Sequence, residues 1–267
     1  MILINDFQKQ KQTKDKITML TAYDYISALI AEQSGVDIIL VGDSSGMVMQ
    51  GNKTTIGVSL NDMLQYGKAV RKGAENTFLL VDMPYMSYHL DLNDTKINAS
   101  KIMIETRANA VKIEGGTKSR IEVIKALQDC EIPVCGHLGL TPQSINVYGS
   151  YGVRGKSEEA QEILQAAKEI EKAGAFMLVL ECVPEELGKI VSTELKIPVI
   201  GIGAGRFTDG QVLVWHDILG LSEMTAKFVK QYVDAKVFIM DGVKQYVSEV
   251  KEGKFPQKEH IYYPILD

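Results

Sequence analysis

The stretch "AFMLVLECVP", residues 175–184, decides the fold. Six consecutive apolar residues, Ala175 to Leu180, are typical of a strand in a parallel sheet that is covered on both faces. The run ends on an acid, Glu181. Because a buried carboxylate costs several kcal/mol unless it is paired or used, we expect Glu181 to have a specific role.

Seven further runs rich in β-branched residues recur along the chain, with amphipathic helical stretches between them. They are "ITMLTAYD" (17–24), "DIILVGD" (37–43), "TFLLVDMP" (77–84), "NAVKIEGG" (109–116), "IPVCGHLG" (132–139), "IPVIGIGAG" (197–205) and "QVLVWHD" (211–217). Eight such strands in a chain of 267 residues indicate an α/β fold, a (β/α)8 TIM barrel. A doubly wound open sheet is the main alternative.

No linker, low-complexity tract or shift in composition divides the chain, so we expect residues 1–267 to form a single barrel domain with an N-terminal extension. The segment 157–174 predicts a helix that starts at Ser157 and stops at Gly174. The link "RFTDG", 206–210, is too short for a crossover helix and predicts a turn. Apolar positions between 237 and 250 predict a C-terminal amphipathic helix followed by a tail.

Composition excludes several classes of function. The net charge is −5 and the basic residues are scattered, so we expect neither a nucleic acid nor an anionic membrane as partner. No apolar run approaches the roughly 20 residues that cross a bilayer. The three cysteines form no CxxC pair and the first residues lack the apolar stretch of a signal peptide, which indicates a reducing cytoplasm.

Polar residues end nearly every predicted strand. They are Asp24, Asp43, Asp82, Lys112 with Glu114, His137, Glu181, and His216 with Asp217. In a closed parallel barrel these strand ends gather on one rim, the face that holds active sites in this fold. We therefore expect the acids to converge, whereas an open sheet would spread them along an edge.

Each of these residues also has a purely structural interpretation. Asp43 in "GDSSG" could cap a helix or shape a turn. Lys112 and Glu114 share one face of a strand and could form a solvated ion pair, although their apolar neighbours favour a buried one. His137 alone is typical of a hydrogen-bonded core histidine.

Several carboxylates without a histidine cluster favour a hard divalent ion on oxygen ligands, magnesium before zinc. Asp43 and Asp82 suffice as direct ligands, and Glu114 could act directly or through water. Such a site leaves positions open for a chelating substrate.

Two loops carry weaker signals. "GIGAG", 201–205, lacks the full spacing of a nucleotide-binding loop, and we interpret its glycines as allowing close approach of a ligand. The segment 146–156, "NVYGSYGVRGK", follows the fifth strand and is expected to act as a mobile lid, with an inert surface loop as the alternative.

The motifs "VGDSSGMVMQG", "VDMPYMSY", "AVKIEGG", "PVCGHLGLTPQSIN", "LVLECVP" and "IPVIGIGAG" occur in order between residues 41 and 205, within a resemblance that runs from about residue 17 to 260. In these motifs the sequence resembles the ketopantoate hydroxymethyltransferase family. The resemblance implies a barrel related to phosphoenolpyruvate mutase and isocitrate lyase, a Mg²⁺ cofactor and a homodecamer. It also implies transfer of a hydroxymethyl group from the co-substrate 5,10-methylenetetrahydrofolate to a 2-oxo acid, 3-methyl-2-oxobutanoate. The product would be ketopantoate, in the first committed step of pantothenate synthesis.

The resemblance also implies roles for individual residues. The metal ligands would be Asp43, Asp82 and Glu114; the oxo-acid site would comprise Asp43, Ser44, Asp82, Lys112 and His137; and Glu181 would be the proton acceptor. One departure lies outside the site, where Arg107 replaces the glycine that usually ends a helix. We expect that helix end to form differently, with some strain.

Two other functions stay open at this point. A magnesium-dependent carbon-carbon lyase or phosphomutase of the related superfamily would use the same oxo-acid chelate. A catalytically silent barrel could serve as a binding or assembly module.

Overall fold

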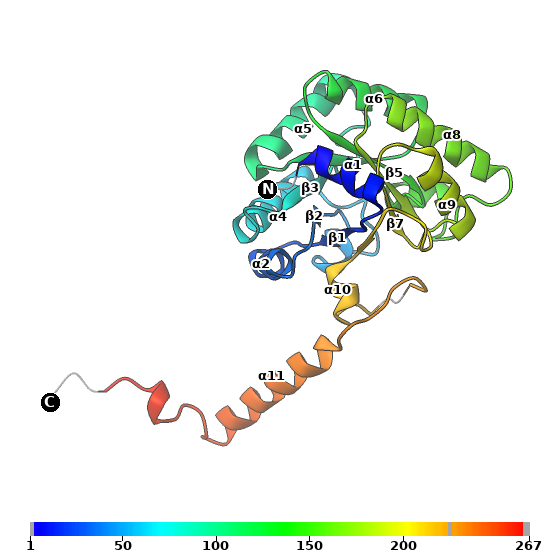
Figure 1. Cartoon of the computed structure of the whole chain (residues 1–267). Coiled ribbons are helices and arrows are strands. Elements are labelled where there is room, and N and C mark those ends of the chain that lie inside the picture. The colour runs from blue at the N-terminus through cyan, green and yellow to red at the C-terminus, as the bar shows by residue number, and fades with distance from the viewer. Residues whose placement is uncertain (1–2, 224–225, 264–267) are drawn as a thin grey trace. The chain divides into compact units, whose positions relative to one another are not determined.

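The computed structural model describes residues 3–223 and 226–263, and Figure 1 traces the chain. The chain divides into two compact units, Met1–Trp215 and His216–Asp267, and each is described by itself.

The first unit is built on a closed barrel of eight parallel strands in chain order, with β8 paired to β1. The strands are β1 (Ile17–Thr21), β2 (Ile38–Val41), β3 (Phe78–Asp82), β4 (Ala110–Glu114), β5 (Val134–Gly139), β6 (Met177–Glu181), β7 (Val199–Ile202) and β8 (Gly210–Leu213). Each of the eight predicted runs overlaps one of them. The predicted TIM barrel is confirmed.

Helices surround the barrel (Figure 1). They are α1 (Ile4–Thr13), α2 (Tyr25–Gln33), α3 (Ser45–Val48), α4 (Leu60–Gly73), α5 (Leu92–Thr106), α6 (Lys118–Gln128), α7 (Ile145–Tyr148), α8 (Glu159–Lys172) and α9 (Glu185–Glu194), with a 3₁₀ turn, η1 (Pro142–Ser144). β2, β3, β4 and β5 are buried along their whole length, because helices cover their outer side chains and the barrel interior holds the inner ones.

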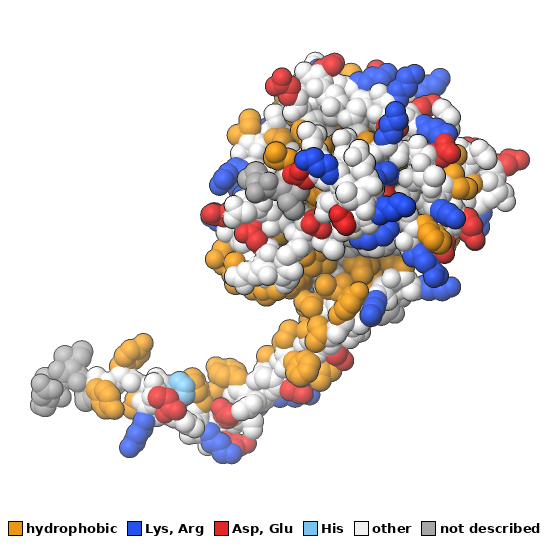
Figure 2. Space-filling view, viewed as in Figure 1, with side chains coloured by type: hydrophobic (Ala, Val, Ile, Leu, Met, Phe, Trp, Pro, Cys, Tyr) orange, Lys and Arg blue, Asp and Glu red, His pale blue; other side chains and the backbone are white. Residues whose placement is uncertain are grey.

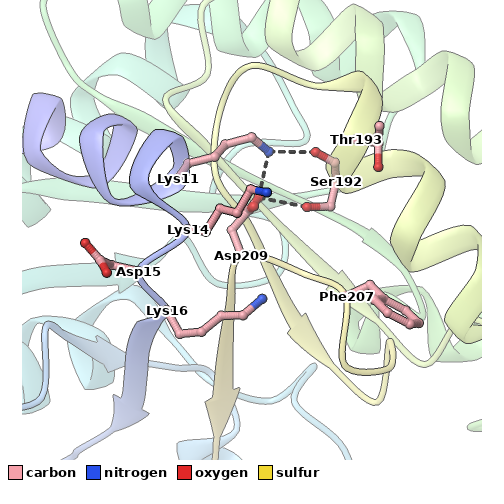
Figure 3. A pocket seen from close by; sticks show the side chains of 8 residues that line it. All are labelled: Lys11, Lys14, Asp15, Lys16, Ser192, Thr193, Phe207 and Asp209. Atoms are coloured by element: carbon pink, nitrogen blue, oxygen red, sulfur yellow. Dashed lines mark hydrogen bonds and ion pairs between the residues drawn. The ribbon is translucent and has the colours of Figure 1, made fainter.

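Helix α1 closes the end of the barrel at which the strands begin. Phe7 is fully buried in the interior cluster and meets the ring of Phe78 edge-on, with centroids 5.1 Å apart. The Nζ of Lys11 donates to Asp209, at 2.6 Å, and to the carbonyl of Ser192. A cavity of about 290 Å³ beside this contact is lined by Lys11, Lys14, Asp15, Lys16, Ser192, Thr193, Phe207 and Asp209 (Figure 3). The contacts of α1 therefore lie where the strands begin. The predicted site residues lie at the opposite side of the barrel, where the strands terminate.

Three predicted boundaries are wrong. Asp24 does not extend β1 but caps α2, where its carboxylate accepts from the backbone N–H groups of Ile26 and Ser27. β8 ends at Leu213, and His216 and Asp217 lie in the short helix α10 (Trp215–Ile218) and belong to the second unit, not to a strand end. Ser157 has a φ of 53°, so α8 begins only at Glu159. The predicted turn between β7 and β8 is confirmed.

Arg107 ends α5 in the left-handed conformation, with a φ of 55°. The expectation that this end forms differently is therefore wrong, because the cap keeps the conformation that glycine favours. The expected strain is present, since a side chain in this region costs about 1 kcal/mol.

The second unit contains α11 (Ala235–Lys251) and a short 3₁₀ turn, η2 (Lys258–His260). The predicted C-terminal helix is confirmed as α11, and Val237, Met240, Val243 and Val247 form an exposed apolar stripe along it (Figure 2). Among the described residues, no helix has both the length and the apolar character that crossing a membrane requires.

Candidate active site

The predicted site residues lie where the barrel strands end. β3 ends on Asp82, β4 carries Lys112 and ends on Glu114, β5 carries His137, and β6 ends on Glu181. Asp43 follows β2 by two residues. The sequence predicts convergence only for a closed barrel, and the closed barrel brings these groups into one connected cluster.

An ion-pair chain joins β3 and β4. The strand register places Asp82 beside Lys112, and Nζ of Lys112 lies 3.1 Å from Oδ1 of Asp82 and 3.8 Å from Oε1 of Glu114. All three side chains are at most 4 % exposed. The solvated ion pair considered for Lys112 and Glu114 is thereby excluded, and the pair is buried.

His137 joins this chain to Glu181. Its Nδ1 lies 3.3 Å from Oε1 of Glu114, and its Nε2 lies 3.1 Å from Oε2 of Glu181, without the alignment of a hydrogen bond. Burial and the Lys112 ammonium, whose Nζ lies 3.1 Å from Nδ1, act to lower the pKa of His137. The contacts with Glu114 and Glu181 outweigh them and raise this pKa to about 9. The contacts with the two carboxylates therefore favour the protonated form of His137.

Asp43 does not cap a helix. Its backbone N–H donates to Oδ2 of Asp82 at 3.0 Å, and its own Oδ2 accepts from Nε2 of Gln143 at 2.8 Å. The neighbouring Ser44 exchanges a hydrogen bond of 2.8 Å with the hydroxyl of Tyr23. A Cβ on Gly42 would meet Oγ of Ser44 at 2.7 Å, so a larger residue at position 42 would displace the Ser44 side chain.

Gln143 and Tyr88 belong to the site although the sequence did not single them out. Gln143 lies in η1, just after β5, and contacts both Asp43 and Glu114. Tyr88 is 2 % exposed and its hydroxyl lies between Gln143 and the backbone of Glu114. A glutamine or tyrosine inside a loop motif has no periodic signal, so only the long motif "GHLGLTPQSIN" could have drawn attention to Gln143.

The cluster carries more negative than positive charge. Four carboxylates (Asp43, Asp82, Glu114 and Glu181) face one ammonium and one imidazolium. Burial, and then the charges of Glu114 and Asp82, raise the pKa of Asp43 well above its usual value. Burial also raises the pKa of Asp82, whereas the contacts of Glu114 with His137 and Lys112 outweigh its burial and lower its pKa.

These residues fit a divalent cation by donor type and by charge. Carboxylate oxygens are the ligands that magnesium prefers. Among the residues that the structure describes, the buried Oδ1 of Asp82 has no hydrogen-bond partner, and it lies 3.1 Å from Nζ of Lys112. A cation would also offset the charge that raises the pKa of Asp43. Within residues 3–223 and 226–263, no three His, Cys, Asp or Glu side chains are grouped closely enough to hold an ion together. The metal-ligand roles of Asp43, Asp82 and Glu114 therefore stay a prediction.

The backbone around Glu181 is tightly fixed. Gly139 has a φ of 89°, and a Cβ there would meet the carbonyl oxygen of Glu181 at 2.1 Å. Cys182 has a φ of 48°, its N–H donates to the carbonyl of Ile202, and its carbonyl accepts from the N–H of Arg154. The end of β6 is thus held from both neighbouring strands and from the segment 146–156.

The contacts of the segments 146–156 and 201–205 are as follows. α7 occupies the start of the segment 146–156, and Arg154 anchors its end by lying over the ring of Tyr148, 3.9 Å from the centroid. In "GIGAG", a Cβ on Gly205 would meet Cγ of Glu185 at 2.5 Å. The glycine therefore allows close approach of α9, and the expected approach of a ligand to this loop stays a prediction.

Comparison with known proteins assigns the chain to a family. Residues 1–258 match the family described as Ketopantoate hydroxymethyltransferase. The 3-methyl-2-oxobutanoate hydroxymethyltransferase of Clostridium novyi (strain NT) is 49% identical over 261 residues, which cover 97% of this chain and 94% of the relative. The enzyme of the same name from Bacillus cereus (strain AH187) is 51% identical over 259 residues, covering 96% and 93%.

Solved structures with low sequence identity share the fold. Phosphonopyruvate hydrolase superposes with a TM-score of 0.63 at 11% identity, covering 99% of this chain and 93% of its own. 2,3-Dimethylmalate lyase, a member of the PEP mutase/isocitrate lyase superfamily, superposes with a TM-score of 0.61 at 13% identity, covering 98% and 93%. With nearly the whole chain matched at about half identity to enzymes of one name, the protein belongs to the ketopantoate hydroxymethyltransferase family.

Proposed function

We propose that this protein transfers a hydroxymethyl group from 5,10-methylenetetrahydrofolate to 3-methyl-2-oxobutanoate, with magnesium assistance, and so forms ketopantoate for pantothenate and coenzyme A synthesis. One observation carries the proposal: a single chain of contacts runs from Asp43 and Asp82 through Lys112, Glu114 and His137 to Glu181. It provides a carboxylate pair for a cation at one end and a separate carboxylate for a proton at the other.

Asp43 and Asp82 would hold the magnesium ion directly, and Glu114 would act directly or through water. Support comes from the donor set and excess negative charge of the cluster, and from phosphonopyruvate hydrolase, a barrel of the same fold solved with oxalate and Mg²⁺. When bound, the ion would polarise the keto oxygen of the oxo acid as a Lewis acid.

The chain's own residues would bind the oxo acid and move the proton. The ammonium of Lys112 is buried among carboxylates, whose charges outweigh the effect of burial and raise its pKa, so it stays charged and can offset the substrate carboxylate. Ser44 and His137 would supply hydrogen bonds to the oxo acid. The carboxylate of Glu181 would accept the proton from C3, and the electron pair of that C–H bond would become the enolate.

Opening of one of the two carbon-nitrogen bonds of the folate methylene would leave an iminium, and the enolate carbon would form its bond to that carbon while the C=N π pair passes to nitrogen. The second carbon-nitrogen bond would then break with its electron pair going to nitrogen, and a hydroxyl group from water would take its place, so that tetrahydrofolate and ketopantoate leave. The proton from Glu181 and the remaining proton of the water would end on the two folate nitrogens, which returns Glu181 to its carboxylate form. Fixing the end of β6 through Gly139 and Cys182 keeps the carboxylate in place for both transfers.

We further propose that the protein works in the cytoplasm as a homodecamer acting on small molecules, with neither a nucleic acid nor a membrane as partner. The net charge of −5 supports the last point. Light scattering should then give about ten times the chain mass of 29.5 kDa.

The test is the formation of ketopantoate from 3-methyl-2-oxobutanoate and methylenetetrahydrofolate, with and without a chelator of divalent ions. We expect product that depends on both substrates and disappears with the chelator. Cleavage of phosphonopyruvate without folate, in place of ketopantoate formation, would instead assign the chain to the lyase and phosphomutase activities.

A further inference from the structure

Gln143 connects two of the proposed metal ligands. Its Nε2 donates to Oδ2 of Asp43 at 2.8 Å, and its backbone N–H donates to Oε2 of Glu114 at 3.0 Å. The side chain is 5 % exposed. One residue thus sets the spacing between a carboxylate that follows β2 and a carboxylate that ends β4.

The orientation of the Gln143 amide follows from its neighbours. The backbone N–H of Glu114 can only donate, so the hydroxyl oxygen of Tyr88 accepts it, at 3.0 Å. The hydroxyl proton of Tyr88 is then free to donate to Oε1 of Gln143, at 2.7 Å. Nε2 must therefore face Asp43, and its second proton goes to the carbonyl of Met83 at 3.0 Å. Every polar atom of the amide is satisfied in one orientation.

This amide counteracts a repulsion. Asp43 is buried beside Glu114 and Asp82, whose charges would otherwise favour turning its carboxylate away or protonating it. Among the residues that the structure describes, Gln143 donates the only hydrogen bond that this carboxylate receives. The bond occupies Oδ2 and leaves Oδ1 for other ligands.

We propose that Gln143 is a positioning residue, oriented by Tyr88, that holds Asp43 in the arrangement in which it binds the divalent cation and, with it, the oxo acid. This inference rests on the proposed function, because it assigns Gln143 a part in the same cation site. Replacement of a residue that orients a metal ligand in this way typically weakens metal binding by roughly 10- to 100-fold.

The experiment measures Mn²⁺ binding by the electron paramagnetic resonance signal of free Mn²⁺, with 3-methyl-2-oxobutanoate present. Gln143→Met keeps the length of the side chain and removes its hydrogen bonds. We expect at least about 10-fold weaker Mn²⁺ binding and a higher KM for the oxo acid, with a smaller change in kcat. Tyr88→Phe should also weaken Mn²⁺ binding. The double variant should lose less affinity than the two single losses combined, because part of the effect of Tyr88 passes through Gln143 and part through its bond with the backbone of Glu114.

Thr106→Val is the matched control. It removes two buried hydrogen bonds of Oγ1 of Thr106 at the end of α5, one donated to the carbonyl of Ile102 and one accepted from the backbone N–H of Ala108. It should lower the free energy of unfolding and leave Mn²⁺ affinity unchanged. If Gln143→Met fails to fold, Tyr88→Phe alone carries the test.

Wild-type Mn²⁺ affinity in folded Gln143→Met, or in Tyr88→Phe where that variant stands alone, would overturn the inference. Asp43→Asn separates this failure from a failure of the proposed function. If Asp43→Asn loses Mn²⁺ and the Gln143 variant does not, only the positioning role is wrong. If Asp43→Asn also binds Mn²⁺ normally, the cation site itself is wrong.

Discussion

Nε2 of His137 lies 3.1 Å from Oε2 of Glu181. This contact joins the proposed proton acceptor to the buried cluster of acids, because the other ring nitrogen of His137 lies 3.3 Å from Glu114. An imidazolium held between two carboxylates balances part of their charge. It also gives Glu181 a fixed position without a direct contact to the proposed metal ligands of β2 and β3.

The raised pKa of His137 predicts how stability depends on pH. Its pKa is about 9 in the folded protein, against 6.5 for a histidine in an unfolded chain. The stabilisation is therefore fully present below pH 6.5 and is lost as the pH rises through 9, by an amount on the order of 3 kcal/mol. Urea unfolding of the metal-free protein at a series of pH values measures it.

His137→Gln should remove this part of the pH dependence, because glutamine does not titrate in this range. At each pH, the free energy of unfolding of His137→Gln is subtracted from that of the wild type, which cancels the contributions of the other titrating groups of the cluster to a first approximation. Equal slopes between pH 6.5 and 9 in the two proteins would mean that His137 is not held as an imidazolium.

Asp82→Asn should weaken binding of the divalent cation and of the oxo acid together, by at least about 10-fold for the cation. The reason is that Oδ1 of Asp82, which is buried with no hydrogen-bond partner in the described part of the chain, is proposed to bind the cation. Calorimetric titration with Mg²⁺ and 3-methyl-2-oxobutanoate checks both affinities.

Asp91→Asn is the control for that substitution. Asp91 caps α5 from outside the cluster, and asparagine caps helices about as well as aspartate, so stability and Mg²⁺ affinity should stay unchanged. Retained Mg²⁺ affinity in Asp82→Asn would remove Asp82 from the proposed ligands.

Arg107→Gly should stabilise the protein by about 1 kcal/mol, because Arg107 has a φ of 55° at the end of α5 and glycine adopts this conformation without strain. Denaturant unfolding measures the change. Lys101→Gly, in the middle of the same helix, should instead destabilise by about 1 kcal/mol. A loss of stability in Arg107→Gly would show that the left-handed residue is not strained.

The barrel could be predicted because its strands are continuous apolar runs, and a closed parallel barrel then dictates where their ends meet. The errors lie where a residue type serves two purposes. Asp24 caps a helix although it follows an apolar run, and a serine three residues later, Ser27, was the available signal. His216 and Asp217 follow a run that continues past the true end of β8.

The site could be predicted in its titratable residues and not in its supporting amide. Carboxylates, lysine and histidine are conspicuous at strand ends, and their contacts follow from barrel closure and strand register. The role of Gln143 depends on a loop turning a neutral side chain back over β2 and β4. Such a position has no signature in residue type or spacing, because it is defined only by the folded backbone.

The most direct measurement of the central claim is exchange of the C3 proton of 3-methyl-2-oxobutanoate with solvent deuterium, followed by NMR without folate. In the wild type this exchange should require Mg²⁺. In Glu181→Gln it should fall by at least about 100-fold while Mg²⁺ binding persists, because the amide cannot accept the proton. Exchange at the wild-type rate in Glu181→Gln would contradict the assignment of Glu181 as the proton acceptor.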